Sequence, residues 1–357
     1  MKRILYFIIL LLSSMYAGAQ RISVVDDQGN GIHLVTVLTE DGNMIGITDL
    51  EGMTPDLGGA VRIVLTHVAF KPQLVEVAKV QGGKVMMEDA DYDLPEVQVV
   101  PKPYAYVETY YRVYGFIDNS LRYFSAGIMP NAYSVEKKKL LTGSYNRCRM
   151  EAYLTEGISI TWGLRAEELN AGMIHKSGAS RLQPGGDAAE KYFTTLTDEG
   201  GGKQRVSNPE GTVGFIISDE KQTHLTLDGA KAQIYRNKVL GQERVMKLRE
   251  KKDYEYQFVE VFNHDEDGQS DITDLVMYSN HWEWNGTKGR NKLIIETYAA
   301  ERAYMDKKEF KARKDGLKKQ YKWPLSLDTM EGYAASHGIP AIAPTLRKAI
   351  DRLPKKM

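Results

Sequence analysis

The residues with the clearest capacity for chemistry are oxygen-bearing side chains between positions 263 and 274. Gly268 occupies the sixth position of this twelve-residue stretch. Oxygen ligands occupy positions 1, 3, 5, 9 and 12, which are Asn263, Asp265, Asp267, Asp271 and Asp274. Calcium takes six to eight oxygen ligands, and a glycine at position 6 permits the sharp turn that folds them inward. The spacing therefore indicates a calcium-binding loop as one interpretation.

A metal-free polar hairpin loop is the alternative for the same stretch, and it is favoured. The stretch lies between two strand-like segments, whereas helices flank the usual calcium loop of this spacing. Its first position is Asn263, and its last is Asp274, which reaches less far than a glutamate. Acidic residues are also common in turns because they bond nearby backbone amides. If calcium binds, we expect it to stiffen the loop.

Sequence motifs of hydrolytic enzymes are absent. A zinc peptidase needs two histidines and a glutamate around an open coordination position, and no His-Glu-x-x-His helix occurs. There is no Gly-x-Ser-x-Gly elbow. Cys148 is the single cysteine, which excludes disulfide frameworks and cysteine-rich zinc sites. We therefore predict no catalytic residues and no enzyme. The alternative is a hydrolase with a carboxylate pair in residues 101–357, because only the separation of two carboxylates in space defines such a pair.

The aromatic segment at positions 281–284 has two interpretations. In His281-Trp282-Glu283-Trp284, strand alternation would place both tryptophans on one face, as a sugar-stacking surface requires. Packing within a sheet is the commoner role of such rings, and it is favoured.

A basic segment follows, with a net charge of +5 over residues 301–322. Its nine basic residues are Arg302, Lys307, Lys308, Lys311, Arg313, Lys314, Lys318, Lys319 and Lys322. A solvated helix face is the favoured interpretation. Contact with anionic lipid or cell-wall polymer is the other, and few bulky apolar residues are present for membrane insertion.

Composition limits the class of protein. The 357 residues are 42% hydrophobic and 26% charged, which is close to the average of globular proteins and excludes a disordered chain. The 47 basic residues balance the 47 acidic residues, which argues against a dedicated nucleic-acid binder.

The first 19 residues have the pattern of an export signal. Lys2 and Arg3 precede the apolar run 4–12, and Ala17-Gly18-Ala19 supplies the small residues that a signal peptidase requires. Crossing a membrane takes about 20 apolar residues, so this run is too short to span one. We predict cleavage, a mature chain that begins near Gln20 and no transmembrane span. An uncleaved short anchor is the alternative.

Residues 20 to 100 show short strand patterns that are separated by turns, as in an all-β sandwich. The predicted strands are 22–25, 33–39, 44–48, 60–66, 73–80 and 84–88.

Three motifs in this region resemble the carboxypeptidase regulatory-like domain. They are Thr48-Asp49-x-x-Gly52, His67-Val68-Ala69-Phe70-Lys71 and Leu94-Pro95-Glu96-Val97-Gln98-Val99. The resemblance is to the version at the N-termini of exported Bacteroidetes proteins, including outer-membrane nutrient receptors. The chain departs from that pattern at Met53, where an aromatic is usual, and at Ala69, where glycine is usual.

The resemblance implies a prealbumin-like, seven-stranded β-sandwich without catalysis, with a structural or docking role. It also implies a place in the periplasm or at the periplasmic face of the outer membrane. In that family pattern Asp49 and Gly52 form a turn.

Pro101-Lys102-Pro103 marks a domain boundary. The predicted organisation is therefore a signal peptide (1–19), the sandwich (20–100) and an α+β domain (101–357). Tyrosines three and four apart predict an amphipathic helix over 104–119, whose stripe either packs in a core or stacks on carbohydrate. We predict strand patterns over 121–156 and brief helices at 166–171 and 187–193. An antiparallel meander follows, at 212–218, 222–228, 239–249, 254–262, 272–284 and 292–300. Helices at 301–321 and 344–353 end the predicted fold.

We therefore expect a mainly β protein with α+β character, in which an antiparallel sheet and C-terminal helices follow the sandwich. The function that fits best is a non-enzymatic binding or assembly protein of the cell envelope, whose partner is an envelope protein or a glycan. The alternative is a periplasmic hydrolase that acts on glycan or cell-wall material.

Overall fold

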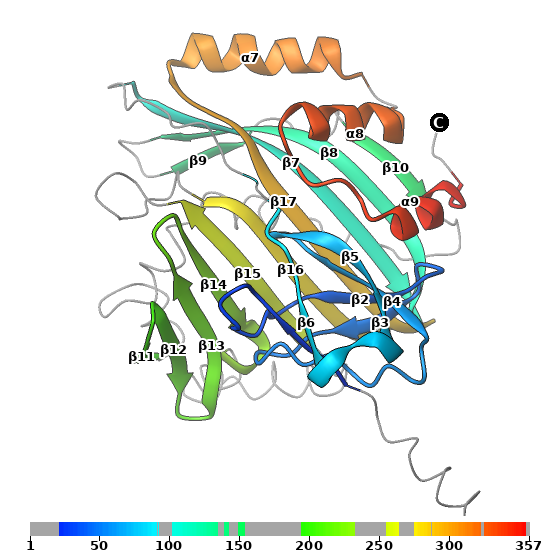
Figure 1. Cartoon of the computed structure of the whole chain (residues 1–357). Helices are drawn as coiled ribbons and strands as arrows, with labels where there is room; N and C mark the ends of the chain where they lie inside the picture. Colours follow the sequence, from blue (N-terminus) through cyan, green and yellow to red (C-terminus); the bar gives the residue numbers. More distant parts are fainter. Residues whose placement is uncertain are drawn as a thin grey trace, which may run out of the picture.

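The computed structural model of the chain is mainly β, with antiparallel sheets and a few helices near the C-terminus (Figure 1). It describes residues 21–90, 92, 102–134, 139–142, 149–153, 194–232, 255–263, 275–286, 288–322 and 325–354. Within these ranges, no helix combines the length and apolar character that a membrane span requires. The predicted helices at 166–171 and 187–193 and the predicted strand at 239–249 lie outside the described residues.

The front domain, residues 21–90, contains two small sheets. A four-stranded antiparallel sheet has the order β3 (Met44–Ile47), β2 (Thr36–Thr39), β4 (Arg62–His67) and β5 (Phe70–Glu76). A two-stranded parallel sheet pairs β1 (Ser23–Val25) with β6 (Lys84–Met86). Two short 3-10 helices, η1 (Val77–Lys79) and η2 (Gln81–Gly83), join β5 to β6. The six strands match the six predicted segments in order.

The turn between β3 and β4 is formed by Asp49 and Gly52, as predicted. Asp49 Oδ1 accepts hydrogen bonds from the backbone amides of Met53 at 2.8 Å and Glu51 at 3.2 Å. Gly52 has a φ of +78°, and a Cβ there would lie 2.4 Å from the carbonyl oxygen of Val24. Asp49 and Gly52 are therefore turn-formers, because only glycine fits this conformation and this close approach.

The second and larger unit is an eleven-stranded sheet. Its order is β10-β8-β7-β17-β16-β15-β14-β13-β12-β11, with β9 beside β8, and every pairing is antiparallel. The strands are β7 (Tyr104–Ile117), β8 (Ser120–Ser134), β9 (Lys139–Thr142), β10 (Arg149–Tyr153), β11 (Thr195–Gly200), β12 (Lys203–Asn208), β13 (Gly211–Ser218), β14 (Gln222–Asp228), β15 (Glu255–Asn263), β16 (Leu275–Gly286) and β17 (Gly289–Met305). Strands β11 to β17 follow one another in sequence and in space. The predicted antiparallel meander is therefore confirmed for its members at 212–218, 222–228, 254–262, 272–284 and 292–300, and β11 and β12 extend it.

The predicted helix over 104–119 is wrong, because these residues form strand β7. The strand is paired with β17 on one side and β8 on the other. Its burial is nearly continuous, so apolar and aromatic residues occupy both faces and no period of two is visible. Tyr110 and Tyr114 are four apart, a spacing that puts side chains on one face of a strand as well as of a helix. The stripe therefore does not distinguish the two structures.

The predicted helix at 301–321 begins too early. Strand β17 continues to Met305, which is paired with Tyr104. Helix α7 (Lys307–Gln320) then begins after Asp306, in a capping box. Asp306 Oδ1 accepts from the amides of Lys308 and Glu309 at 2.7 and 2.8 Å, and Glu309 Oε2 accepts from the Asp306 amide at 2.6 Å.

Two helices complete the described chain. Helix α8 (Leu327–Ser336) was not predicted; its first turn is capped by Ser326, whose hydroxyl accepts from the Thr329 amide at 3.1 Å. Helix α9 (Pro344–Asp351) begins with a proline, so the predicted C-terminal helix is confirmed.

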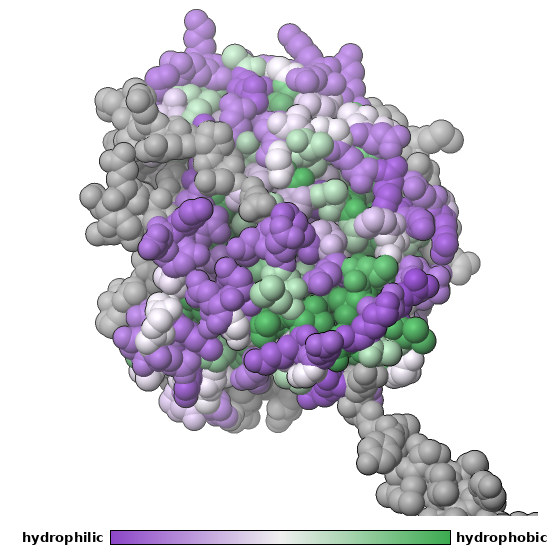
Figure 2. All heavy atoms as spheres, viewed as in Figure 1, coloured by the Kyte–Doolittle hydropathy of each residue, from purple (hydrophilic) through white to green (hydrophobic). Residues whose placement is uncertain are grey.

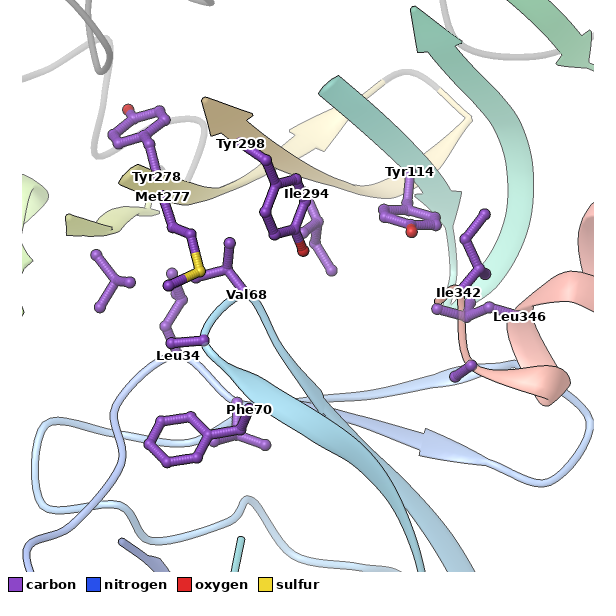
Figure 3. Packing of buried hydrophobic residues seen from close by; sticks show 14 of the residues in the cluster. Leu34, Val68, Phe70, Tyr114, Met277, Tyr278, Ile294, Tyr298, Ile342 and Leu346 are labelled. Carbon is purple, nitrogen blue, oxygen red and sulfur yellow. The ribbon is translucent and has the colours of Figure 1, made fainter. Parts of the chain in front are cut away.

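The front domain packs on one face of the large sheet, and the two units share one hydrophobic core (Figure 3). Leu34 and Val68 of the front domain point toward Met277 of β16 (Figure 3). Tyr92 packs edge-on against Tyr298 of β17, with ring centroids 5.8 Å apart, and its hydroxyl donates to the carbonyl of Ala299.

The C-terminal helices cover the neighbouring part of the same face. Ile342 and Leu346 lie near Tyr114 of β7 (Figure 3). The sheet face is thus buried by two separate parts of the chain.

Leu34 shows how strongly this packing acts on the front domain. Its φ is +64°, a left-handed conformation that is uncommon for a residue with a side chain, yet it is only 4% exposed. Such a conformation persists where the surrounding structure fixes it. The Leu34 side chain in the shared core supplies that constraint.

We expect Leu34→Ala to lower the unfolding free energy of the whole chain by about 2–5 kcal/mol, the usual cost of deleting a buried leucine side chain. Chemical denaturation that is followed by near-UV circular dichroism should show one transition, because the core is shared. The matched control is Val61→Ala, since Val61 is 76% exposed and should change stability by no more than about 0.5 kcal/mol. Two separate transitions, of which only one moves, would contradict the shared core.

Candidate binding site

A groove lies in the front domain between the outer edges of β5 and β6. Its volume is about 620 Å³, and it is lined by Asp27, Lys71, Pro72, Gln73, Met86, Met87, Glu88 and Asp89. The two strands are tied together at one end, where the Lys71 amide donates to the Glu88 carbonyl at 2.8 Å and the Ala90 amide donates to the Ala69 carbonyl at 2.9 Å. Beyond this point β5 and β6 belong to different sheets, which leaves a space between them.

The edge of β5 presents backbone groups to the outside of the sheet. The Val77 amide donates to the Val61 carbonyl at 3.0 Å, so the backbone of Val77 faces β4. Backbone hydrogen bonding alternates along an antiparallel strand, so the N–H and C=O groups of Val75 and Gln73 also face β4. The N–H and C=O groups of Leu74 and Glu76 therefore face outward, as expected at the edge of a sheet.

Apolar side chains accompany this edge. Leu74 is 55% exposed, and Met86 is 61% exposed. Figure 2 shows hydrophobic residues on this side of the molecule with hydrophilic residues around them. Exposed apolar surface beside unpaired backbone groups is a combination that binding partners use.

A second, smaller pocket adjoins the groove and shares Asp27 and Asp89 with it. It is about 60 Å³ in volume and lies between the front domain and strands β13, β14 and β15. Three histidines line it, namely His33, His67 and His224. Asp26 and Asp219 add carboxylates to its lining. A space of this size suits one or two water molecules and is too small for a sugar ring.

Burial keeps these histidines neutral. It lowers the pKa of His33 to about 4 and that of His67 to about 3, and it also lowers the pKa of His224. The Ala69 amide donates to His67 Nδ1 at 3.1 Å, so the neutral ring carries its proton on Nε2. This ring therefore offers an N–H group and not a metal-binding lone pair. No three His, Cys, Asp or Glu side chains within the described ranges are grouped to hold a metal ion.

Glu283 is held as a carboxylate by its neighbours. His281 Nε2 lies 3.2 Å from it, the Arg290 Nε donates to it at 2.7 Å and Lys292 Nζ lies at 3.7 Å. Burial alone would raise the pKa of Glu283, but these groups lower it to about 2. A carboxylate that is ionised so firmly is an ion-pair partner and not a proton donor at neutral pH.

The tryptophans beside Glu283 are packing residues. Trp282 and Trp284 are half-buried and pack against a cluster on the opposite face of the sheet from the front domain. The Trp282 ring lies 4.3 Å from that of Tyr256. The structure thus favours the packing interpretation over a sugar-stacking surface.

Glu108 is another buried carboxylate whose bonding capacity is used. It accepts from Tyr106 at 2.5 Å, from Tyr333 at 2.6 Å and from the Arg313 Nε at 3.1 Å. Arg313 also pairs with Glu301. The cluster ties α7 and α8 to β7, which is a structural role.

The predicted calcium ligands are only partly described. Asn263 ends β15, and its Oδ1 accepts from Gln222 Nε2 at 2.9 Å. Asp265, Asp267, Asp271 and Asp274 lie outside the described residues. The calcium loop therefore stays a prediction.

Sequence reasoning missed the groove and the histidine pocket. His33, His67 and His224 are far apart in the chain, and none belongs to a metal or catalytic motif. Only the docking of the front domain on β13 to β15 brings them together. The edge of β5 had one local signal, Pro72, because proline in a strand favours an edge position.

Comparison with known proteins adds no assignment. No protein-family model matches the chain, and no curated protein matches it.

We expect the unfolding free energy to rise with pH between about 4 and 6.5 through the histidines of the pocket. In this range the unfolded chain protonates its histidines near 6.5, whereas folded His33 stays neutral down to about 4. The unfolded state therefore binds more protons, and stability increases as the pH rises. The measurement is urea unfolding at several pH values.

The variant His33→Asn should flatten this pH dependence, because it removes one of the titrating groups. His337→Asn, outside the pocket, is the control and should leave the contribution of His33 in place. Equal slopes for His33→Asn and the unchanged chain would show that His33 is not a buried neutral group.

Proposed function

We propose that this chain is an exported, non-enzymatic binding or assembly protein of the cell envelope. The export pattern in residues 1–19 supports the compartment. The motifs that resemble the carboxypeptidase regulatory-like domain support a front domain of that family, a prealbumin-like seven-stranded sandwich with a docking role. They also support a place at the periplasmic face of the outer membrane.

The groove between β5 and β6 is the observation that carries the proposal. A strand edge with free backbone groups can accept an extended peptide as an additional strand, and its flanking pockets then select side chains. Next to the groove, Leu74 and Glu76 of the β5 edge supply the backbone groups, and the exposed side chains of Leu74 and of Met86 in the groove lining supply apolar contacts. The bound segment is therefore an extended strand of an envelope protein.

The charge of the groove indicates the side chains that it selects. Asp27, Glu88 and Asp89 outnumber Lys71, which pairs with Glu88 at 2.5 Å. An extended segment with basic residues beside apolar ones fits this lining.

The buried groups of the large sheet support binding over hydrolysis. The face that a hydrolase could have used for a cleft carries the front domain and helices α8 and α9. Glu108 and Glu283, two carboxylates on that sheet, are occupied by arginine, tyrosine, histidine and lysine partners. A carboxylate pair would need access to substrate and to water.

A protein partner suits the site better than a glycan. Carbohydrate binding uses exposed aromatic rings, but Tyr110 and Tyr114 are buried, and Trp282 and Trp284 are half-buried. The groove instead offers backbone hydrogen-bonding groups and an apolar edge.

Two variants at one position test the strand-addition proposal. Leu74→Pro removes the outward N–H but leaves the face toward β4 unchanged, so we expect it to abolish capture of the partner. Leu74→Ala keeps that N–H and loses only the side chain, so it should weaken capture less. The measurement is chemical crosslinking in envelope extract, with identification of the crosslinked partner and the crosslinked residues by mass spectrometry.

The exposed residue Val61 provides the control. It is 76% exposed but lies on the β4 side of β5, where its carbonyl accepts from the Val77 amide, and not at the outer edge, so Val61→Lys should capture the partner as the unchanged chain does. Recovery of the same crosslinks with Leu74→Pro would exclude strand addition at β5. Recovery of no envelope partner by the unchanged chain would contradict the binding function.

A further inference from the structure

Helix α7 carries a stripe of lysines along one side. Lys307, Lys311, Lys314 and Lys318 are spaced four, three and four residues apart. At 3.6 residues per turn this spacing aligns them along the helix over about 17 Å. Lys308 and Lys319 flank the stripe, so six lysines share one broad face, here called the lysine face.

The contacts of α7 with the rest of the molecule fix the orientation of this face. Leu317 is buried, and the Phe310 ring lies 6.1 Å from that of Tyr106. Arg313 reaches Glu108 at 3.1 Å. These three residues hold the helix to the molecule. Lys307, Lys308, Lys311 and Lys319 are exposed, whereas Lys314 and Lys318, at the border of the held side, are half-buried. Figure 1 shows α7 along the outer edge of the molecule, beyond the end of β17.

The lysine face has a cost in helix stability. Like charges at i,i+3 and i,i+4 destabilise a helix, and lysines in the first turn oppose the helix dipole. Lys307 and Lys308 lie in that first turn. None of the six lysines forms an ion pair with a described residue. The acidic residue Glu309 pairs instead with Lys102 at 2.8 Å.

We propose that the lysine face of α7 binds the anionic headgroups of a lipid membrane. A row of cations along one side of an outer helix can lie against a flat, negatively charged surface. Each lysine near such a surface adds about 1 kcal/mol to the attraction. An anionic polymer would be held better by a groove with basic walls, whereas this face is a single helix. The exposed positions between the lysines, such as Ala312, Asp315 and Gly316, include no bulky apolar residue, so the contact is electrostatic and superficial.

The membrane concerned, at the periplasmic face of the envelope, rests on the proposed function. Attraction to anionic lipid does not, because it depends only on the charge and exposure of α7. The two proposals can therefore fail separately: the groove experiment measures capture of a protein, and the following experiment contains only lipid.

The test is co-sedimentation of the mature chain with phosphatidylcholine vesicles that contain or lack phosphatidylglycerol. We expect binding only to vesicles with phosphatidylglycerol, and we expect added salt to release the protein. Replacing three exposed lysines in Lys307→Gln, Lys311→Gln and Lys319→Gln should weaken binding about 100-fold or more. The glutamines remove repulsion within the helix, so the melting temperature should stay equal or rise, which separates lost binding from lost folding.

The matched control replaces three exposed lysines elsewhere, Lys84→Gln, Lys221→Gln and Lys348→Gln. It changes the net charge equally and should leave vesicle binding intact. Equal loss of binding in the control would overturn the proposal, because overall charge would then explain the attraction. Binding to heparin without binding to vesicles would also overturn it, in favour of a polymer partner.

Discussion

The burial of one face of the eleven-stranded sheet is the constraint on which the rest of the structure depends. The front domain covers the part over β16 and β17, and residues near α9 cover the part over β7. The hydrophobic core beneath these two parts of the chain is continuous, so both belong to one folded unit with the sheet. The left-handed backbone of Leu34 follows from this constraint, because a strained turn persists where buried packing holds it.

The same burial dictates the polar chemistry beneath the covers. Arg112 is 2% exposed, and its Nη2 donates to the Pro340 carbonyl at 2.6 Å, which ties the segment before α9 to β7. Glu108 receives tyrosine and arginine donors in the same way. A buried charge without partners would cost several kcal/mol, so these networks are a requirement of the covered face. His33 and His67, buried between the front domain and the sheet, meet this requirement differently. Burial keeps them neutral, so they need no counterion.

The parts of the fold that could be predicted are those with a local signal. Strands β13 to β16 have turn residues at their ends, and α9 begins with Pro344, so each was predicted close to its position. Strand β7 could not be recognised, because Tyr110 and Tyr114 satisfy the spacing of a helix and of a strand buried on both faces. The histidine pocket had no local signal at all. It exists because docking of the front domain brings His33 and His67 to His224, which tertiary packing alone decides.

The two proposed contact surfaces are compatible in space. Helix α7 lies beyond the end of β17, whereas β5 and β6 lie over the face of the sheet, away from α7 (Figure 1). A chain that rests on a membrane through α7 therefore leaves the groove open to an extended segment of another protein. Acidic groove and basic helix also carry opposite charge, so an anionic surface attracts α7 and repels the groove lining. Although the net charge of the chain is zero, this difference in charge would orient the groove away from an anionic lipid surface bound by α7.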